Sequence, residues 1–154
     1  MEYTKRRNLN RGYIKLDVWQ RGMDLFDLAF RLATNVSDFK LKSQFTDAVQ
    51  SVSSNVAEGY GRRTLADYLN FLTIAKGSLG ESFTRAAGLW RVKILTDKDF
   101  DQFDALHYEV ENKLLALIES LEAKRGSNDW SDTIPTRQRS TNPPIHQSTN
   151  PLIH

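Results

Sequence analysis

Residues 16–125 contain no proline, and their apolar side chains recur at intervals of three and four rather than two. Proline interrupts the interior of a helix, and this spacing collects apolar side chains on one helix face, whereas a half-buried strand would alternate. The pattern therefore predicts that this stretch is entirely α-helical. Because the stretch has no predicted strand, folds in which a glycine-rich phosphate-binding loop follows a strand are excluded.

The apolar pattern divides the stretch into four predicted helices, at 17–39, 43–58, 64–91 and 96–124. The third begins at Thr64, an N-cap with Asp67 in the capping-box position. The second is expected to end at Gly59-Tyr60-Gly61, with a glycine in the left-handed conformation. Four amphipathic helices with short connections predict an antiparallel up-down four-helix bundle over residues 16–125.

Two flanking segments differ from this stretch. Residues 1–15 carry five basic side chains against Glu2, and we expect a flexible basic arm, of a kind that can bind nucleic acid. Residues 126–154 are rich in Ser, Thr, Asn and Pro, and the motif Ser-Thr-Asn-Pro occurs twice. Such a segment buries too little apolar surface to offset its ordering entropy, so it is expected to be a disordered tail.

Composition narrows the class of protein further. The chain has 154 residues, of which 40% are hydrophobic and 26% charged, as in an ordinary soluble domain. It has no cysteine, which excludes disulfides and thiolate metal sites. No apolar run approaches the roughly 20 residues of a membrane-spanning helix, and no apolar segment follows the first basic residues as in a secretory signal. We therefore expect a cytoplasmic protein that does not contact membranes.

Residue types that carry catalysis or bind metal are sparse in the predicted bundle. His107 is the sole histidine of residues 16–125, and it has no second ligand at a suitable spacing. The acidic run at 97–104 lacks the glycine and terminal glutamate of a calcium-binding loop, and acidic residues suit the first turn of a helix. We expect no metal, no cofactor and no enzymatic activity.

One face of the third predicted helix consists mostly of small residues, among them Ala66, Thr73, Gly77, Gly80 and Thr84. Each interior glycine costs a helix about 1 kcal/mol relative to alanine, so this small stripe indicates that another helix packs closely there. That helix belongs either to the same chain, where the second predicted helix is also rich in small residues, or to another subunit. The first predicted helix has two apolar seams, which favours a homo-oligomer over a monomer with a wide core.

Charged side chains flank the turn between the second and third predicted helices. Glu58 lies near a helix C-terminus, and Arg62 and Arg63 precede a helix N-terminus, so all three oppose the helix macrodipoles. Either these charges pair, with each other or with an acid of another subunit, and hold the turn, or the arginines face outward and bind phosphates.

Further polar residues are candidates for binding or for holding the turn. Arg85, Arg91 and Lys93 add positive charge along and after the third predicted helix, either as a solvated face or as part of a binding surface. Asn55, near the end of the second predicted helix, is expected to satisfy a buried polar partner. Gly59 and Gly61 are expected to shape the turn itself.

Three motifs together resemble a known family. They are Ser54-Asn55-Val56-Ala57-Glu58-Gly59, then Gly61-Arg62-Arg63, then Phe71-Leu72-x-Ile74-Ala75-x-Gly77-Ser78-x-x-Glu81. In this order and spacing they are similar to the signature of the 23S rRNA-intervening-sequence proteins, and Val18-Trp19-Gln20 resembles the opening of that family. The similarity covers about residues 16–122. It departs at Ser53, where the family usually has proline, which bears on the expected local shape of the second helix.

The resemblance implies an up-down four-helix bundle that assembles as a homopentameric barrel around a central channel. It also implies a link to RNA, because some members are encoded in insertions within large-subunit ribosomal RNA genes. A related branch, the accessory protein of diversity-generating retroelements, binds nucleic acid and partners a reverse transcriptase. The family is not known as an enzyme.

Two classes of function remain open. The first is a non-enzymatic homo-oligomeric scaffold that binds RNA, DNA or a nucleic-acid-processing protein through the basic arm and the basic residues Arg62, Arg63, Arg85, Arg91 and Lys93. The second is a protein–protein interaction module with no nucleic-acid role. The nearly neutral charge of residues 16–125 weakens the first, whereas repetition of a small basic patch around a ring strengthens it.

Overall fold

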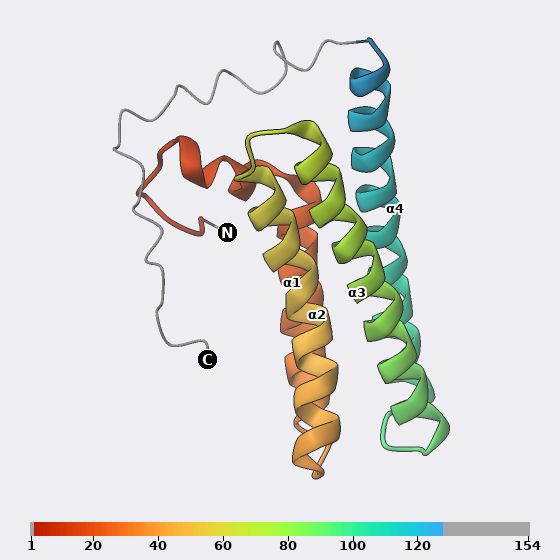
Figure 1. Ribbon diagram of the computed structural model, residues 1–154. Helices are drawn as coiled ribbons and strands as arrows, with labels where there is room; N and C mark the ends of the chain where they lie inside the picture. The colour runs from red at the N-terminus through yellow and green to blue at the C-terminus, as the bar shows by residue number, and fades with distance from the viewer. Residues whose placement is uncertain (1, 128–154) are drawn as a thin grey trace, which may run out of the picture.

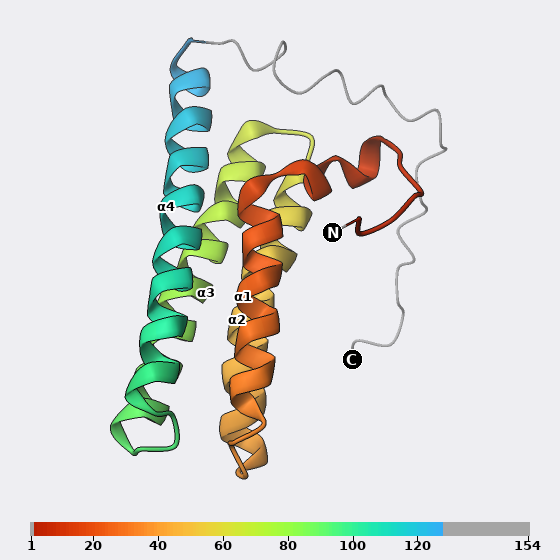
Figure 2. The same cartoon turned by 180° about the vertical axis from the view of Figure 1, so that it is seen from behind.

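A computed structural model of the chain describes residues 2–127 (Figures 1 and 2). The described residues contain five helices and no strand: the 3₁₀ helix η1 (Leu9–Lys15), α1 (Asp17–Ala33), α2 (Phe39–Tyr60), α3 (Leu65–Arg91) and α4 (Asp97–Ser127). The prediction of an all-α fold is confirmed for this part of the chain. The tail predicted from residue 126 lies outside the described residues, except for Gly126 and Ser127 in the last turn of α4.

The four α-helices lie side by side, and consecutive helices run in opposite directions (Figures 1 and 2). α1 packs against α2 and α4, and α3 packs against the same two helices. The chain's N-terminal segment and the α2–α3 turn lie at one end of this helical body, and the α1–α2 and α3–α4 connections lie at the other (Figure 1). Each helix therefore has two neighbours and turns its remaining face outward.

The core runs along the middle of the helices. Phe45 of α2 and Phe103 of α4 are fully buried, with ring centroids 5.4 Å apart. Val49, Val52 and Val56, which the apolar pattern assigns to the same seam as Phe45, are also fully buried. Burial of each such side chain stabilises the fold by about 1.5–3 kcal/mol, so this seam is a main source of cohesion.

The boundary between the first two α-helices differs from the prediction. α1 ends at Ala33 and α2 begins at Phe39, so Phe39 is not the last residue of the first helix, and its side chain is 81% exposed. Asp38 is the N-cap of α2, because its Oδ1 accepts a hydrogen bond of 2.8 Å from the Leu41 amide. Aspartate is among the preferred residues for this role, and its capping bond outweighs the continuing apolar period through Phe39.

The predicted left-handed glycine cap after α2 is wrong. No glycine among residues 2–127 has a positive φ, and Gly61 follows α2 with φ −72°. Gly59 instead allows close packing of α2 on α3, because a Cβ at this position would lie 2.8 Å from both Phe71 Cβ and Tyr68 Cδ2. Its function is to admit a neighbouring helix rather than to turn the chain.

Ser53, the departure from the family pattern, lies within a continuous α2. It is 2% exposed, and its hydroxyl donates a hydrogen bond of 3.2 Å to the Trp19 carbonyl of α1. A Cβ at Gly22 of α1 would meet the Ser53 hydroxyl directly, so the two helices approach closely here. Ser53 of α2 thus lies against Gly22 of α1, and α2 continues through this position without interruption.

In α3 the mostly apolar residues that recur at intervals of four and three from Leu65 to Trp90, with Lys76 among them, predict a core stripe. The buried face of the helix is shifted from this stripe. Lys76 is exposed and Phe83 and Trp90 are more than one third exposed, although all three belong to that stripe. Ser78 is buried instead, with its Oγ 2.8 Å from the Oγ of Ser51 on α2. An α-helix drifts about 20° per heptad from a strict seven-residue repeat, so over the 27 residues of α3 a fixed stripe leaves the core.

Candidate functional site

The α2–α3 turn places its charged residues as a local pair. An Arg62 guanidinium nitrogen lies 2.6 Å from Glu58 Oε1, one helical turn away, and the same guanidinium lies 4.5 Å above the Phe71 ring. Both charged side chains are substantially exposed, so the pair orients Arg62 more than it stabilises the fold. Arg63 is exposed, and no ion pair joins it to any of the residues described.

Asn55 bonds within its own helix. Its Nδ2 donates to the Ser51 carbonyl at 2.8 Å and lies 2.9 Å from the Ser51 hydroxyl, which in turn contacts Ser78 of α3. Asn55 therefore belongs to a small, half-buried polar network between α2 and α3.

The N-terminal segment contacts the same end of the molecule. Residues 9–15, expected as part of a flexible arm, form η1, which packs against α1 and α2. The Tyr13 ring lies 5.6 Å from the Trp19 ring and 6.3 Å from the Tyr60 ring, and the Tyr3 ring lies 4.9 Å from Trp19. Flexibility of the arm in solution stays a prediction, but its described position is against the helical body.

This arrangement brings two basic segments together. We call residues 2–15 with residues 58–63 the basic end. Its basic side chains, all exposed, are Lys5, Arg6, Arg7, Arg11, Lys15, Arg62 and Arg63. Only Glu2 and Glu58 oppose them within the same segments. The two segments are distant in the sequence. They lie together because α1 and α2 run in opposite directions, which returns the end of α2 to the arm.

The remaining predicted binding residues lie at the opposite end of α3. Arg85 contacts Glu81 at 3.6 Å and donates to Gln44 Oε1 at 3.1 Å. Lys93 follows α3 with φ 64°, and its amide donates to the Trp90 carbonyl at 2.9 Å. At 1.5 Å per residue, α3 separates this group from Arg62 and Arg63 by about 40 Å. The five candidates therefore form two separate groups rather than one stripe.

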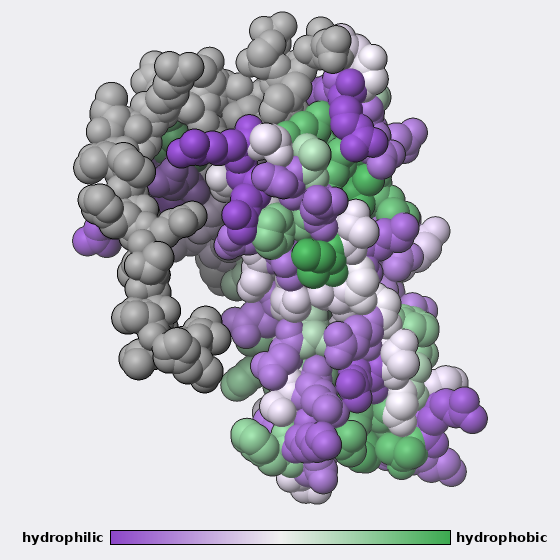
Figure 3. Space-filling model, in the orientation of Figure 1, coloured by the Kyte–Doolittle hydropathy of each residue, from purple (hydrophilic) through white to green (hydrophobic). Residues whose placement is uncertain are grey.

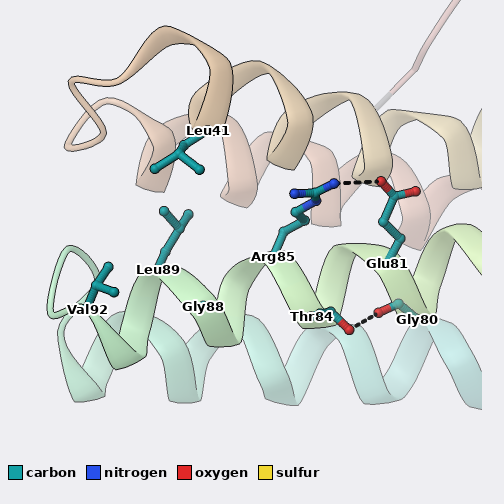
Figure 4. A pocket seen from close by; sticks show the side chains of 8 residues that line it. All are labelled: Leu41, Gly80, Glu81, Thr84, Arg85, Gly88, Leu89 and Val92. Carbon is teal, nitrogen blue, oxygen red and sulfur yellow. Dashed lines mark hydrogen bonds and ion pairs between the residues drawn. The ribbon is translucent and has the colours of Figure 1, made fainter.

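An apolar groove lies beside this second group, between the N-terminal turn of α2 and the C-terminal half of α3 (Figure 4). Its volume is about 630 Å³, and it is lined by Leu41, Gly80, Glu81, Thr84, Arg85, Gly88, Leu89 and Val92. Figure 3 shows hydrophobic side chains among hydrophilic ones over this part of the surface. The groove suits an apolar segment better than a phosphate, because Glu81 already pairs with Arg85.

The small stripe faces outward in the single chain. Ala66, Thr73, Gly77, Gly80 and Thr84 are all exposed. A Cβ at Gly77 or Gly80 would meet nothing within 4 Å, so α2 of the same chain does not pack on the stripe. Packing of another subunit on this stripe stays a prediction.

Arg21, Glu109 and His107 make contacts between helices. Arg21 of α1 lies 2.6 Å from Glu109 of α4 and 2.7 Å from Asp24. The hydrogen bond from Arg21 lowers the pKa of Glu109. His107 is buried, with Nε2 2.7 Å from the Leu79 carbonyl of α3. Within residues 2–127 no group of three or more His, Asp or Glu is placed to hold a metal ion, and no helix there is long and apolar enough to cross a membrane.

The aromatic contacts that hold the arm were not predicted from the sequence. Tyr3, Gly12 and Tyr13 carry this docking, together with Trp19 and Tyr60 of the helical body. The available signal was the presence of two tyrosines in a segment otherwise basic and polar, because a purely solvated arm has little use for large aromatic side chains.

The described residues form an all-α protein of four packed antiparallel helices, with basic side chains gathered at one end. The family of the 23S rRNA-intervening sequence protein matches residues 14–116, and the chain belongs to this family. The arm before residue 14 lies outside the match.

A solved structure shows the same fold. It is a protein of unknown function from the S23 ribosomal protein family of Bacteroides thetaiotaomicron, 19% identical, with a TM-score of 0.63. The similarity covers 66% of this chain and 97% of that chain. A comparison with curated proteins gave no match.

Proposed function

We propose that this chain is a non-enzymatic homo-oligomeric scaffold, built as an antiparallel four-helix bundle, that binds nucleic acid through the basic end. The observation that carries the proposal is the gathering of exposed basic side chains from the arm and the α2–α3 turn at one end of the molecule. Such a surface attracts phosphates and gains free energy from the release of condensed counterions. The bonds are to the phosphate backbone, so this surface positions nucleic acid without reading its sequence.

The scaffold is proposed to be a cytoplasmic homopentamer. Two observations support self-association: the resemblance of the motifs to a pentameric family, and the outward small stripe of α3, where Gly77 and Gly80 leave room for close approach. A ring would present one basic end per subunit on the same side. Several modest patches acting together bind a long polyanion far more tightly than one patch alone.

The proposal is tested first by localised removal of charge. In Arg62→Gln/Arg63→Gln, two phosphate-binding groups are lost from the basic end, and we expect roughly tenfold weaker binding of a labelled structured RNA at about 50 mM salt. The control is Arg91→Gln/Lys93→Gln, which removes the same charge from the far end of α3. Fluorescence anisotropy measures both.

An unchanged affinity in the Arg62/Arg63 variant, or an equal loss in the control, would contradict the proposed site. Circular dichroism confirms that each variant keeps its helices. This check matters because Arg62 also contacts Glu58 and the Phe71 ring.

A protein–protein interaction module is the second candidate function. The groove beside Leu41, Leu89 and Val92 favours it, since exposed apolar grooves commonly accept an apolar helix face. This candidate gains support if the chain binds no nucleic acid at low salt while a defined protein partner is lost on Val92→Glu. Retention of that partner by Val92→Glu would reject the groove.

A further inference from the structure

The N-terminal arm is attached to the helical body through aromatic rings. We call Tyr3, Tyr13, Trp19 and Tyr60 the aromatic clamp. Successive ring centroids lie 4.9, 5.6 and 6.3 Å apart, and both the Tyr3–Trp19 and the Tyr13–Tyr60 pairs meet edge to face. The last ring also contacts Tyr68 of α3 at 6.2 Å. Aromatic rings at these separations stabilise the contact in addition to the stabilisation from buried surface, so the arm docks at a defined position.

Gly12 fixes how closely the arm approaches. A Cβ at this position would lie 2.7 Å from Tyr60 Cζ and 2.9 Å from Tyr60 Cε1, which is closer than a real side chain allows. The neighbouring Ile14 carbonyl accepts a hydrogen bond of 2.8 Å from Gln20 Nε2 of α1. The ring contacts of Tyr13, the close approach at Gly12 and the hydrogen bond to Ile14 therefore all hold the same short segment of the arm.

The clamp sits where the basic side chains gather. Tyr60 is the last residue of α2 and comes directly before Gly61-Arg62-Arg63, while Tyr13 lies between Arg11 and Lys15 of the arm. Contact between the Tyr13 and Tyr60 rings consequently sets the position of the arm's cations relative to those of the turn. All of these cations remain exposed.

We infer that the aromatic clamp is a positioning device that makes the arm and the α2–α3 turn one preorganised surface for the phosphate backbone of nucleic acid. This inference rests on the proposed function and adds which residues give the site its affinity. A free arm would lose conformational entropy each time it bound, and the clamp removes that cost in advance. Tyr13 acts through the arm and does not itself bind the nucleic acid.

The aromatic clamp joins residues outside the family match to residues within it. Tyr3, Gly12 and Tyr13 precede residue 14, where the family match begins, whereas Trp19 and Tyr60 lie inside it. The arm thus adds five basic side chains to a helical body whose own charge is nearly neutral. Nucleic-acid binding by this chain should depend on the arm more than on any part of the matched region.

Limited trypsin digestion of the full-length protein tests the docking alone. Trypsin cleaves after Arg11 and Lys15, two bonds that the docked η1 protects. We expect Tyr13→Ala and Gly12→Val to raise the rate of cleavage after Lys15 about tenfold, as followed by mass spectrometry, because opening now exposes that bond. The rate after Arg11 is not compared, because Gly12 and Tyr13 are themselves part of that cleavage site. Tyr108→Ala and Gly126→Ala are the controls, since Tyr108 is exposed and a Cβ at Gly126 would meet nothing within 4 Å.

Nucleic-acid binding tests the consequence. Tyr13→Ala and Gly12→Val keep every charge of the arm, yet we expect about tenfold weaker binding of a labelled structured RNA at low salt, with both controls unchanged. The same Tyr13→Ala change is then made in a chain with Lys5, Arg6, Arg7, Arg11 and Lys15 replaced by Gln. There it should change the affinity by less than about twofold, because no arm cations remain to be positioned.

Each outcome decides between explanations. Equal cleavage of wild type and clamp variants means that the arm is not docked, and the inference fails. Faster cleavage with unchanged affinity also overturns it, because the arm then binds equally well when free. An equal loss in both charge backgrounds means that Tyr13 contacts the nucleic acid directly. If the wild type binds no nucleic acid, the proposed function fails, and the inference fails with it even where digestion shows a docked arm.

Discussion

Lys93 follows the C-cap of α3 and adopts the left-handed backbone conformation, although it is not a glycine. Among the described residues it alone combines a side chain with a positive φ, at 64°. After it, the Ile94 amide donates back to the Leu89 carbonyl at 2.9 Å and closes the end of α3. This position commonly holds glycine, because a Cβ is disfavoured there by about 1 kcal/mol. Lys93 therefore contributes strain to the fold as well as charge to the surface.

Lys93→Gly should stabilise the protein. Relief of the left-handed strain exceeds the added freedom of glycine in the unfolded chain, so we expect the free energy of unfolding to rise by about 0.5–1 kcal/mol. Urea denaturation followed by circular dichroism measures the change. Arg91→Gly is the matched control, since a glycine within the last helical turn should lower stability by a similar amount. A less stable Lys93→Gly protein would show that the lysine side chain makes a contact worth more than the strain.

The Arg21–Glu109 pair links α1 to α4 and makes stability depend on pH. Because the hydrogen bond from Arg21 lowers the folded-state pKa of Glu109, the pair contributes stability above the usual glutamate range. That contribution is lost as pH falls through the lowered pKa of the folded state. Both side chains are about 40% exposed, at 38% and 42%, so water screens the pair and limits its value to less than about 1 kcal/mol.

Glu109→Gln should accordingly lower the free energy of unfolding by less than about 1 kcal/mol at pH 7, and the difference from wild type should shrink as pH falls below 4.5. Urea denaturation of both proteins at pH 7 and at a pH below 4.5 measures the difference in the free energy of unfolding. Glu119→Gln, at an exposed position on the same helix, should show no such pattern. A difference from wild type that grew on acidification would contradict the assigned sign.

At the scale of elements, α3 presents two different faces of small residues. Its inner face brings Ser78 against Ser51 of α2, while its outer face leaves Gly77 and Gly80 open. A helix rarely keeps interior glycines on a solvent-exposed face without a reason, because each costs about 1 kcal/mol relative to alanine. The outer face is therefore the surface where we place contact between subunits.

Gly80→Leu tests that placement. Within one chain a Cβ at this position meets nothing within 4 Å, and leucine improves helix propensity, so thermal stability of the protomer should not fall. Between subunits it should block close approach and dissociate the oligomer, as measured by sedimentation velocity. Gly126→Leu is the control, again at an open helical glycine. An unchanged oligomer with Gly80→Leu would remove the small stripe from the interface.

The elements were predictable to different degrees, according to how local their signals are. The start of α3 followed directly from Thr64, whose hydroxyl accepts a hydrogen bond of 3.1 Å from the Asp67 amide. The start of α2 did not, because apolar periodicity extends through Phe39 and conceals the cap at Asp38. Grouping of the arm with Arg62 and Arg63 depends on contacts between residues about fifty positions apart, and no local pattern records such contacts.

Across the whole molecule, the basic end and the apolar groove lie apart along the helix axes. The basic end holds the arm and the α2–α3 turn, and the opposite end holds the apolar groove beside Arg85 and Val92. The two ends are separated by the length of α3, about 40 Å. One molecule can therefore contact a polyanion at one end while its other end and its outer α3 face meet proteins.

If the basic end binds phosphates, the affinity for nucleic acid must depend on salt, so a salt titration is the most direct measurement. Wild-type protein is titrated into a labelled structured RNA and a duplex DNA at salt concentrations between about 50 and 200 mM. We expect binding at low salt that weakens steeply and linearly on logarithmic axes, with a slope of several units from multiple phosphate contacts. Absence of binding at low salt, or an affinity that does not change with salt, would contradict it.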